Sequence, residues 1–220
     1  MYEHLNIQIP ELAVQETQDG SGQRLYRTPK GDLYPSITTI LSPLKKEIIT
    51  KWRERVGNKV ADIECQWGRE RGTAIHLAVE EFIKNKGLVG QPLLVRMLVE
   101  DLMPYLRKIG KIHCQEVPLF SDLFRTAGRC DCIAEYSNKL SIVDFKTSKR
   151  PKRIEWIEDY FLQTSFYAYA YWERTGYKIE QSVILIATEQ GQAQEFIVYP
   201  WLYWKKLKDV RKDYKDEFGI

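Results

Sequence analysis

The sequence predicts an α/β or α+β protein in which helices pack on both faces of a central sheet. Two observations predict this class. Helical patterns fill most of the stretch from residue 44 to residue 109, and short alternating runs of polar and apolar residues begin at Lys111. A further helical pattern, two more strands and a last helix follow, and this order lets helices cover both faces of one sheet.

The length of the chain favours one domain. With 220 residues, 44% of them hydrophobic, the chain can bury one substantial core. We expect residues 1–220 to form a single domain with four parts: an N-terminal arm and hairpin (1–33), a helical part (34–110), a sheet with one helix (111–200) and a C-terminal helix (201–220).

The first half is predicted to be mainly helical. Residues 1–22 are polar and carry turn residues at 19–22, which predicts a loosely attached arm or an edge strand. Residues 23–28 and 33–37 flank the Pro29–Asp32 turn and predict a hairpin. Three helices are then expected, over residues 44–56, 59–86 and 93–109, and the second stops at Gly87.

The second half is predicted to hold the sheet. Three neighbouring antiparallel strands are expected over residues 112–120, 125–136 and 140–147. A helix over 154–174, strands over 182–188 and 194–199, and a Trp-rich basic helix over 201–218 complete the chain.

Composition excludes several classes of protein. A net charge of +3 is too small to predict nucleic-acid binding by itself, although basic residues cluster at 45–55, 149–153 and 205–212. Each cluster is equally typical of a solvated face. No run approaches the ~20 apolar residues that span a bilayer, and no signal peptide or presequence is visible, so a soluble cytoplasmic protein is expected. The four cysteines lack zinc spacing and are expected to be reduced thiols.

One strand pattern indicates a divalent-metal site. Asp144 and Lys146 alternate along a strand and therefore share a face, while Val143 and Phe145 point to the other side. The Ser137-Asn138 turn is expected to bring Asp131 of the preceding strand beside Asp144, where a cation would balance two carboxylates. An exposed strand with an Asp-Lys pair is the alternative.

The same alternation makes a prediction for the preceding strand. Asp131 is expected to share its face with Arg129 and Ile133. Cys130 and Cys132 are expected on the opposite face as small core residues.

Three further patterns surround this pair. One helix face carries Gly72, His76 and Glu80 at a spacing of four residues, and Gly68 lies one turn before them. The two glycines have no side chain, which would allow a phosphate backbone to approach the helix closely. Gln163 and Tyr167 repeat the spacing on a later helix, and Glu116 lies on the strand before Asp131. Each pattern has another interpretation when it is read alone. The glycine and histidine spacing is also typical of a helix that breaks near Gly68 with a packed histidine. The Gln163 and Tyr167 spacing is also typical of an amphipathic stripe, and Glu116 of an exposed acid on a strand.

Five motifs occur together in the order seen in RecB-type nucleases: Gly72-Thr-Ala-Ile-His76, Glu116, Gly128-Arg-Cys-Asp131, Asp144-Phe-Lys146 and Gln163-Thr-Ser-Phe-Tyr167. The chain thereby resembles the PD-(D/E)XK nuclease superfamily over roughly residues 34–190. Its Tyr34–Leu41 segment resembles the mitochondrial genome maintenance exonucleases and their phage relatives. The resemblance implies a restriction-endonuclease-like core, with a central mixed sheet flanked by helices.

The resemblance also implies roles for particular residues. Asp131 and Asp144 would be metal ligands, with His76 as a further ligand and Glu116 as another candidate, and Lys146 would position and activate the attacking water. Nucleic-acid contacts are implied for Ser36, Thr38, Thr39, Gly72, Thr147, Ser148, Lys149, Gln163 and Tyr167. Hard oxygen ligands with one imidazole suit Mg²⁺, with Mn²⁺ as a substitute. The iron-sulfur cluster of some relatives is not expected, because no cysteine follows Cys132.

The function implied is a Mg²⁺-dependent DNA exonuclease that prefers single strands and leaves 5′-phosphates. Two alternatives stay open: a structure-specific endonuclease or RNase on the same fold, and a module that binds DNA ends without cutting. The expected setting is a monomer, phage-encoded or bacterial, acting on DNA with a free end alone or with a replication or recombination protein.

Overall fold

A five-stranded mixed sheet forms the centre of the structure, a computed structural model that describes residues 1–5, 7–9, 12 and 25–219. Its strands run in the order β3 (Ile109–Ser121), β4 (Thr126–Tyr136), β5 (Lys139–Ser148), β6 (Gln181–Thr188) and β7 (Gln194–Val198). β5 and β6 are parallel, and the other neighbours are antiparallel. The predicted meander of three antiparallel strands and the mixed sheet are therefore confirmed.

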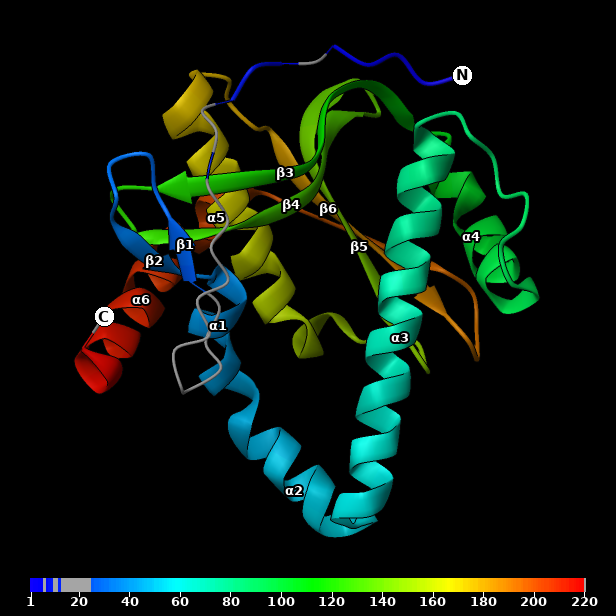
Figure 1. Ribbon diagram of the computed structural model, residues 1–220, viewed down its shortest axis with the longest axis horizontal. Helices are drawn as coiled ribbons and strands as arrows, with labels where there is room; N and C mark the ends of the chain where they lie inside the picture. Colours follow the sequence, from blue (N-terminus) through cyan, green and yellow to red (C-terminus); the bar gives the residue numbers. More distant parts are fainter. Residues whose placement is uncertain (6, 10–11, 13–24, 220) are drawn as a thin grey trace.

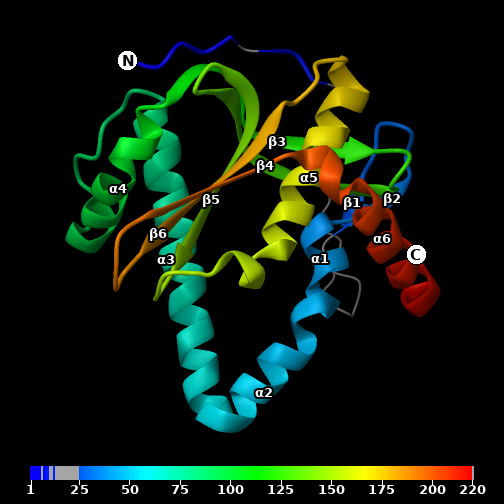
Figure 2. The same cartoon turned by 180° about the vertical axis from the view of Figure 1, so that it is seen from behind.

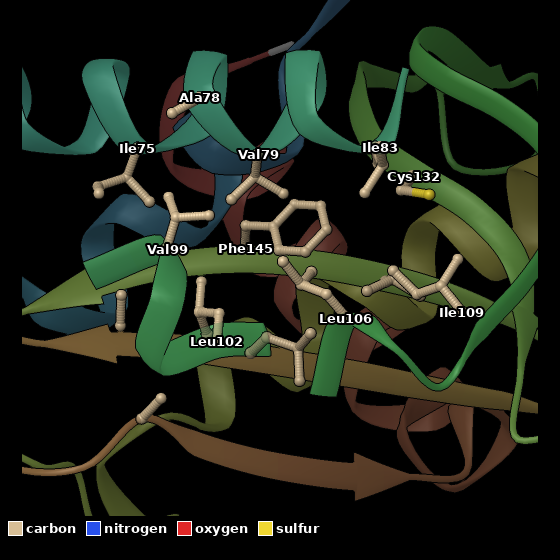
Figure 3. Close-up of a cluster of buried hydrophobic side chains, with 14 of the residues drawn as sticks. Ile75, Ala78, Val79, Ile83, Val99, Leu102, Leu106, Ile109, Cys132 and Phe145 are labelled. Carbon is tan, nitrogen blue, oxygen red and sulfur yellow. The ribbon is translucent and has the colours of Figure 1, made fainter. Parts of the chain in front are cut away.

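Helices cover both faces of this sheet (Figure 1). On one face lie α3 (Asn58–Ile83) and α4 (Leu93–Leu106), and on the other lie α1 (Ile37–Leu41), α5 (Glu158–Thr175) and α6 (Trp204–Phe218). Figure 3 shows the first interface, where Phe145 of β5 packs among Val79, Val99 and Leu106. Each such buried side chain contributes about 1.5–3 kcal/mol, so this layer fixes α3 above β5.

Part of the helical half stands away from the sheet. α2 (Lys46–Val56) buries no residue, and it meets the first half of α3 in a V-shaped projection (Figures 1 and 2). α3 runs without a break through Gly68 and Gly72, so the helix break considered from the sequence is absent. Within the described ranges, no helix has both the length and the apolar character needed to cross a membrane.

Several predicted boundaries were wrong, each for a local reason. The hairpin of β1 (Leu25–Arg27) and β2 (Leu33–Pro35) ends before Ile37, because Ser36 caps α1 by accepting a hydrogen bond from the Thr39 amide at 3.0 Å. The helix predicted to end at Ile109 ends at Leu106, because Ile109 belongs to β3 and pairs there with Tyr136 of β4. The last two predicted helices each begin with a separate 3₁₀ turn, Ile154–Trp156 and Pro200–Tyr203.

The described part of the N-terminal arm lies along the edge of the sheet. The Leu5 amide donates a hydrogen bond to the Ile112 carbonyl at 2.8 Å, and His4 forms an isolated parallel β-bridge with Ile112. The predicted turn at residues 19–22 lies outside the described residues.

Candidate active site

The hairpin of β4 and β5 places the two aspartates. Ser137 and Asn138 both have positive φ, 50° and 64°, as a two-residue hairpin turn requires. The pairing runs from Tyr136↔Lys139 to Cys132↔Val143. The next position in this register sets Asp131 opposite Asp144, as predicted from the turn.

The two strands separate at Asp131. Its Oδ2 accepts a hydrogen bond from the Phe145 amide at 2.8 Å, in place of a backbone carbonyl, and the paired register stops there. The predicted alternation along β4 was therefore wrong. Cys130 lies in the core beneath α5 together with Ile133, whereas Cys132 lies in the core beneath α3. Because of this interruption, Asp131 and Ile133 do not share a face of the sheet, and Cys130 and Cys132 lie on opposite faces.

Glu116 on β3 stands at the same interruption. Its φ is 48°, a left-handed conformation that a residue other than glycine adopts at a cost of about 1–3 kcal/mol. Strain of this kind persists where the surrounding structure enforces it, and it is concentrated at functional sites.

Three side chains from three elements meet here. Ligand-type atoms of His76 on α3, Glu116 on β3 and Asp131 on β4 all lie within 4.8 Å of one another. Nδ1 of His76 is 3.5 Å from Oδ2 of Asp131, and the His76 ring packs edge-on against Phe145. The structure thus brings together three of the four predicted metal ligands as one group.

The fourth, Asp144, lies in the adjacent ion pair. Asp144 is fully buried, its Oδ2 is 2.5 Å from Nζ of Lys146, and its Oδ1 has no hydrogen-bond partner among the described residues. Burial raises the pKa of Asp144 above its ordinary value, although the charge of Lys146 opposes this. Burial alone would lower the pKa of Lys146, but the charges of Asp144 and Asp131 raise it overall, so Lys146 stays an ammonium.

The donor set fits a hard divalent cation. Burial and the negative charges of Asp131 and Glu80 raise the pKa of Glu116 to about 7. A cation between these carboxylates would remove the repulsion and give the unpartnered Oδ1 of Asp144 a ligand role. Carboxylate oxygens with one imidazole suit Mg²⁺ or Mn²⁺.

Removing the charge of Glu116 is expected to stabilise the metal-free protein. Because its pKa is raised in the folded state, the free energy of unfolding falls as pH rises from about 4.5 to about 7. Glu116→Gln should therefore be more stable by about 1–3 kcal/mol at pH 8 in EDTA, with a smaller difference near pH 5. Urea unfolding at both pH values measures this. Glu100→Gln, at an exposed position of α4, is the control, and equal effects in the two variants would contradict the expectation.

The predicted nucleic-acid residues next to the site lie where α3 faces the end of β5. A Cβ on Gly72 would sit 3.8 Å from Oγ1 of Thr147, so these two positions are neighbours across a surface with room. Lys149 pairs with Glu64 of α3 at 3.0 Å. Ser148 is buried and donates to the Arg150 carbonyl at 2.6 Å, which gives it a structural partner.

Alanine at Gly72 is expected to separate stability from binding. The added methyl group meets only ordinary van der Waals contact, so Gly72→Ala should stabilise α3 by about 1 kcal/mol. If a phosphate backbone crosses this face, the same variant should weaken binding of a single strand in Ca²⁺ several-fold. Gly68→Ala, one turn earlier on the same face and with open space around the added methyl group, should have the same two effects. Stabilisation with unchanged binding would show that the strand passes elsewhere.

Gln163 and Tyr167 are brought together beneath the site. Nε2 of Gln163 donates to the Tyr167 hydroxyl at 3.3 Å, and the tyrosine is only 2% exposed. Its ring and hydroxyl lie 3.0 Å from where a Cβ on Gly128 would stand. Glycine at 128 is therefore required by the close approach of Tyr167, and Gln163 is the more accessible member of the pair.

The segment at the start of α1 is partly structural. Ser36 is 2% exposed, and its Oγ is bonded to the hydroxyls of Thr38 (2.9 Å) and Thr39 (2.7 Å). The two threonines line a separate cleft with Lys46 and Arg53. The structure does not bring these three residues into the carboxylate group.

One residue near the site, Tyr160, was not placed there by sequence reasoning: Nζ of Lys146 lies 5.2 Å from the centre of its ring. Glu80, which the four-residue spacing put on the His76 face, lines the same cavity as His76 and Glu116. Tyr160 precedes Gln163 by three residues, so extending the Gln-Tyr helix face by one turn would have found it.

This geometry coincides with a family-level match. The sequence model of the PD-(D/E)XK nuclease superfamily matches residues 49–215, and the chain belongs to that superfamily. Its mixed sheet between helical layers is the restriction-endonuclease-like core expected from the motifs.

Curated relatives carry a more specific name. Mitochondrial genome maintenance exonuclease 1 of Homo sapiens is 23% identical over 177 residues, which cover 73% of this chain and 51% of the human protein. The Xenopus tropicalis protein of the same name is 23% identical over 215 residues, covering 83% of this chain and 58% of that protein. The chain thus spans about half the length of the curated relatives it matches. Among solved structures, a putative exonuclease from Eubacterium rectale superposes with a TM-score of 0.46 at 13% identity, covering 68% of this chain and 65% of that one.

Proposed function

We propose that this nuclease is a Mg²⁺-dependent DNA exonuclease that prefers single strands and leaves 5′-phosphates. The observation that carries the proposal is the group formed by His76, Glu116 and Asp131 beside the buried Asp144–Lys146 ion pair. The relatives named above are exonucleases, which supports action at a free end.

Different residues would have different roles in cleavage. The cation would be held by His76, Glu116, Asp131 and Asp144. A divalent cation bound there would supply positive charge that stabilises the phosphate and the departing 3′ oxygen. The Lys146 ammonium, held by Asp144, donates from Nζ to a water oxygen and orients that water for in-line attack. The water oxygen bonds to phosphorus as the bond to the 3′ oxygen breaks. The attacking water gives up one proton to solvent and the departing 3′ oxygen takes one up, so the products are a 3′-hydroxyl and a 5′-phosphate.

Exposed aromatic side chains support a preference for single strands. Trp67 is 59% exposed and lines a cavity directly beyond the end of β5, where Lys149 pairs with Glu64 and where Glu70 and Glu189 also lie. Trp156 is 57% exposed, and the guanidinium of Arg153 lies 5.5 Å from its ring centre. Aromatic rings beside cations bind unpaired bases by stacking and phosphates by charge, at about 1–3 kcal/mol for each stacked base.

A closed single-stranded circle tests the requirement for an end. In Mg²⁺, linear strands labelled at the 5′ or the 3′ terminus should be degraded, whereas a circle of the same sequence should persist. The order in which the labels are released reports polarity, and a product that T4 ligase accepts without kinase treatment carries the 5′-phosphate. Cutting of the circle at a rate similar to that of the linear strand would favour the endonuclease alternative.

Replacing the metal distinguishes cutting from binding alone. The linear strand should bind in Ca²⁺ without cleavage and be cut when Mg²⁺ or Mn²⁺ is added. Binding that never leads to products with either ion would support the non-cleaving module instead. An RNA strand cut as fast as the DNA strand would overturn the assignment of the substrate.

A further inference from the structure

A pocket lined by three tryptophans lies on the side of the sheet covered by α5 and α6. Its volume is about 330 Å³, and its lining consists of Ala168, Trp172, Lys178, Ile179, Trp201 and Trp204. Apart from the amine of Lys178, these side chains are essentially apolar. The segment that leads into α6 lies against α5 (Figure 2). It contributes Trp201 to the lining, and α5 contributes Ala168 and Trp172.

The pocket is surrounded by exposed apolar side chains. Trp172 and Trp201 are 45% and 43% exposed, and Leu202 is 66% exposed. Tyr199 is stacked on Trp201 with ring centres 4.9 Å apart. A contiguous exposed patch of this kind is typical of an interaction site, and tryptophan is the residue that most often anchors one.

A separate basic groove lies next to the pocket. The Tyr169 ring lies between the two: its centre is 5.5 Å from that of Trp204, which lines the pocket, and 4.9 Å from that of Phe124, which lines the groove. The charged residues lining the groove are Arg125, Lys208, Arg211, Lys212 and Lys215. No acidic side chain lines the pocket or the groove within the described ranges, although the whole chain has a net charge of only +3.

The chemistry of this surface specifies its ligand. We propose that the pocket and groove bind an acidic peptide segment of a partner protein, with one aromatic or large aliphatic side chain in the tryptophan pocket and carboxylates along the lysines. Apolar anchoring gives such a contact its affinity, and complementary charge gives it orientation and a fast association rate. The tryptophans line one pocket, and among the described residues Phe124 is the only aromatic side chain lining the groove, so the surface fits one anchoring side chain better than a series of stacked bases. Binding of a nucleic-acid strand is the competing outcome of the test.

The surface is separate from the carboxylate site. Lys178 and Ile179 come just before β6, whereas Lys146 pairs with Ile186 further along the parallel strands. At about 3.3 Å per residue, this separation is roughly 20 Å along the sheet. A peptide bound here leaves the nuclease site free, so the contact would deliver the enzyme to a protein without blocking cleavage.

A labelled synthetic peptide tests the proposal. The probe carries six aspartates followed by Gly-Leu-Phe, and its binding is measured by fluorescence anisotropy at low and at physiological salt. The wild-type protein should bind it, and binding should weaken with salt. Trp201→Ala and Lys208→Glu should each weaken binding at least tenfold. Replacing the terminal phenylalanine of the probe by alanine should do the same. Trp67→Ala, at another exposed tryptophan, should leave the affinity unchanged, and Trp201→Ala should cut a free DNA strand at the wild-type rate.

Three results would overturn it. One is no binding at millimolar peptide and low salt. Another is equal weakening by Trp67→Ala. The third is loss of oligonucleotide binding or of a protein dimer in Trp201→Ala with peptide binding unchanged, which would assign the surface to nucleic acid or to a second copy of the chain.

Discussion

Lys146→Met is expected to lower the single-turnover rate of cleavage by about 10²–10³-fold or more with substrate binding in Ca²⁺ unchanged. The ammonium is the charged donor beside the unpartnered oxygen of Asp144, and losing one such donor typically removes about 2.7–4 kcal/mol of transition-state stabilisation. Rapid-quench assays on an end-labelled strand measure the effect. Lys139→Met, at an exposed position at the start of the same strand, is the matched control.

Stability must be separated from catalysis in this variant. Lys146→Met leaves the buried carboxyl of Asp144 without its counter-charge, a change that typically costs about 3–5 kcal/mol. Combining it with Asp144→Asn removes both charges and should restore much of the thermal stability without restoring cleavage. Recovery of cleavage together with stability would contradict a catalytic role for the pair.

Asp131→Asn is the second variant with a large expected effect. The amide oxygen can still accept the hydrogen bond from the Phe145 amide, so the separation of β4 and β5 should be kept. The negative charge beside His76 and Glu116 is lost, and cation affinity and Mg²⁺-dependent cleavage should both fall by more than about 100-fold, beyond the effect of losing an outer-shell partner.

Two measurements check this expectation. Thermal unfolding with and without Mn²⁺ reports cation binding without any need for activity, because a ligand that binds only the folded state raises the transition temperature. Asp101→Asn, at an exposed position of α4, is the control. If Mn²⁺ raises the transition temperature of the Asp131→Asn protein as much as that of the wild type, Asp131 is not a ligand of the cation.

The sequence predicted the features of the site that depend on local rules. Strand alternation put Asp144 and Lys146 on one face, and the structure pairs them at 2.5 Å. The two-residue turn at Ser137-Asn138 fixed the register up to Cys132↔Val143, so that Asp131 and Asp144 occupy the next position on the two strands. The four-residue spacing on α3 placed His76 on the face that meets the sheet.

Features that depend on contacts between distant residues were not predictable. The Asp131 carboxylate takes the place of a backbone group in the ladder, and Glu116 adopts a left-handed conformation opposite it, so alternation fails at one position of β4. Tyr167 is buried because Gly128, on another element, leaves room for its ring. The contact of Tyr160 with Lys146 likewise depends on how α5 packs against β5. No periodicity within one segment carries that information.

A crystal of the protein soaked in Mn²⁺ tests the central claim most directly, because anomalous scattering locates the cation without reference to activity. We expect a peak within about 2.0–2.6 Å of ligand atoms of His76, Glu116 and Asp131. A peak elsewhere, with none between these three side chains, would contradict the assignment of this site.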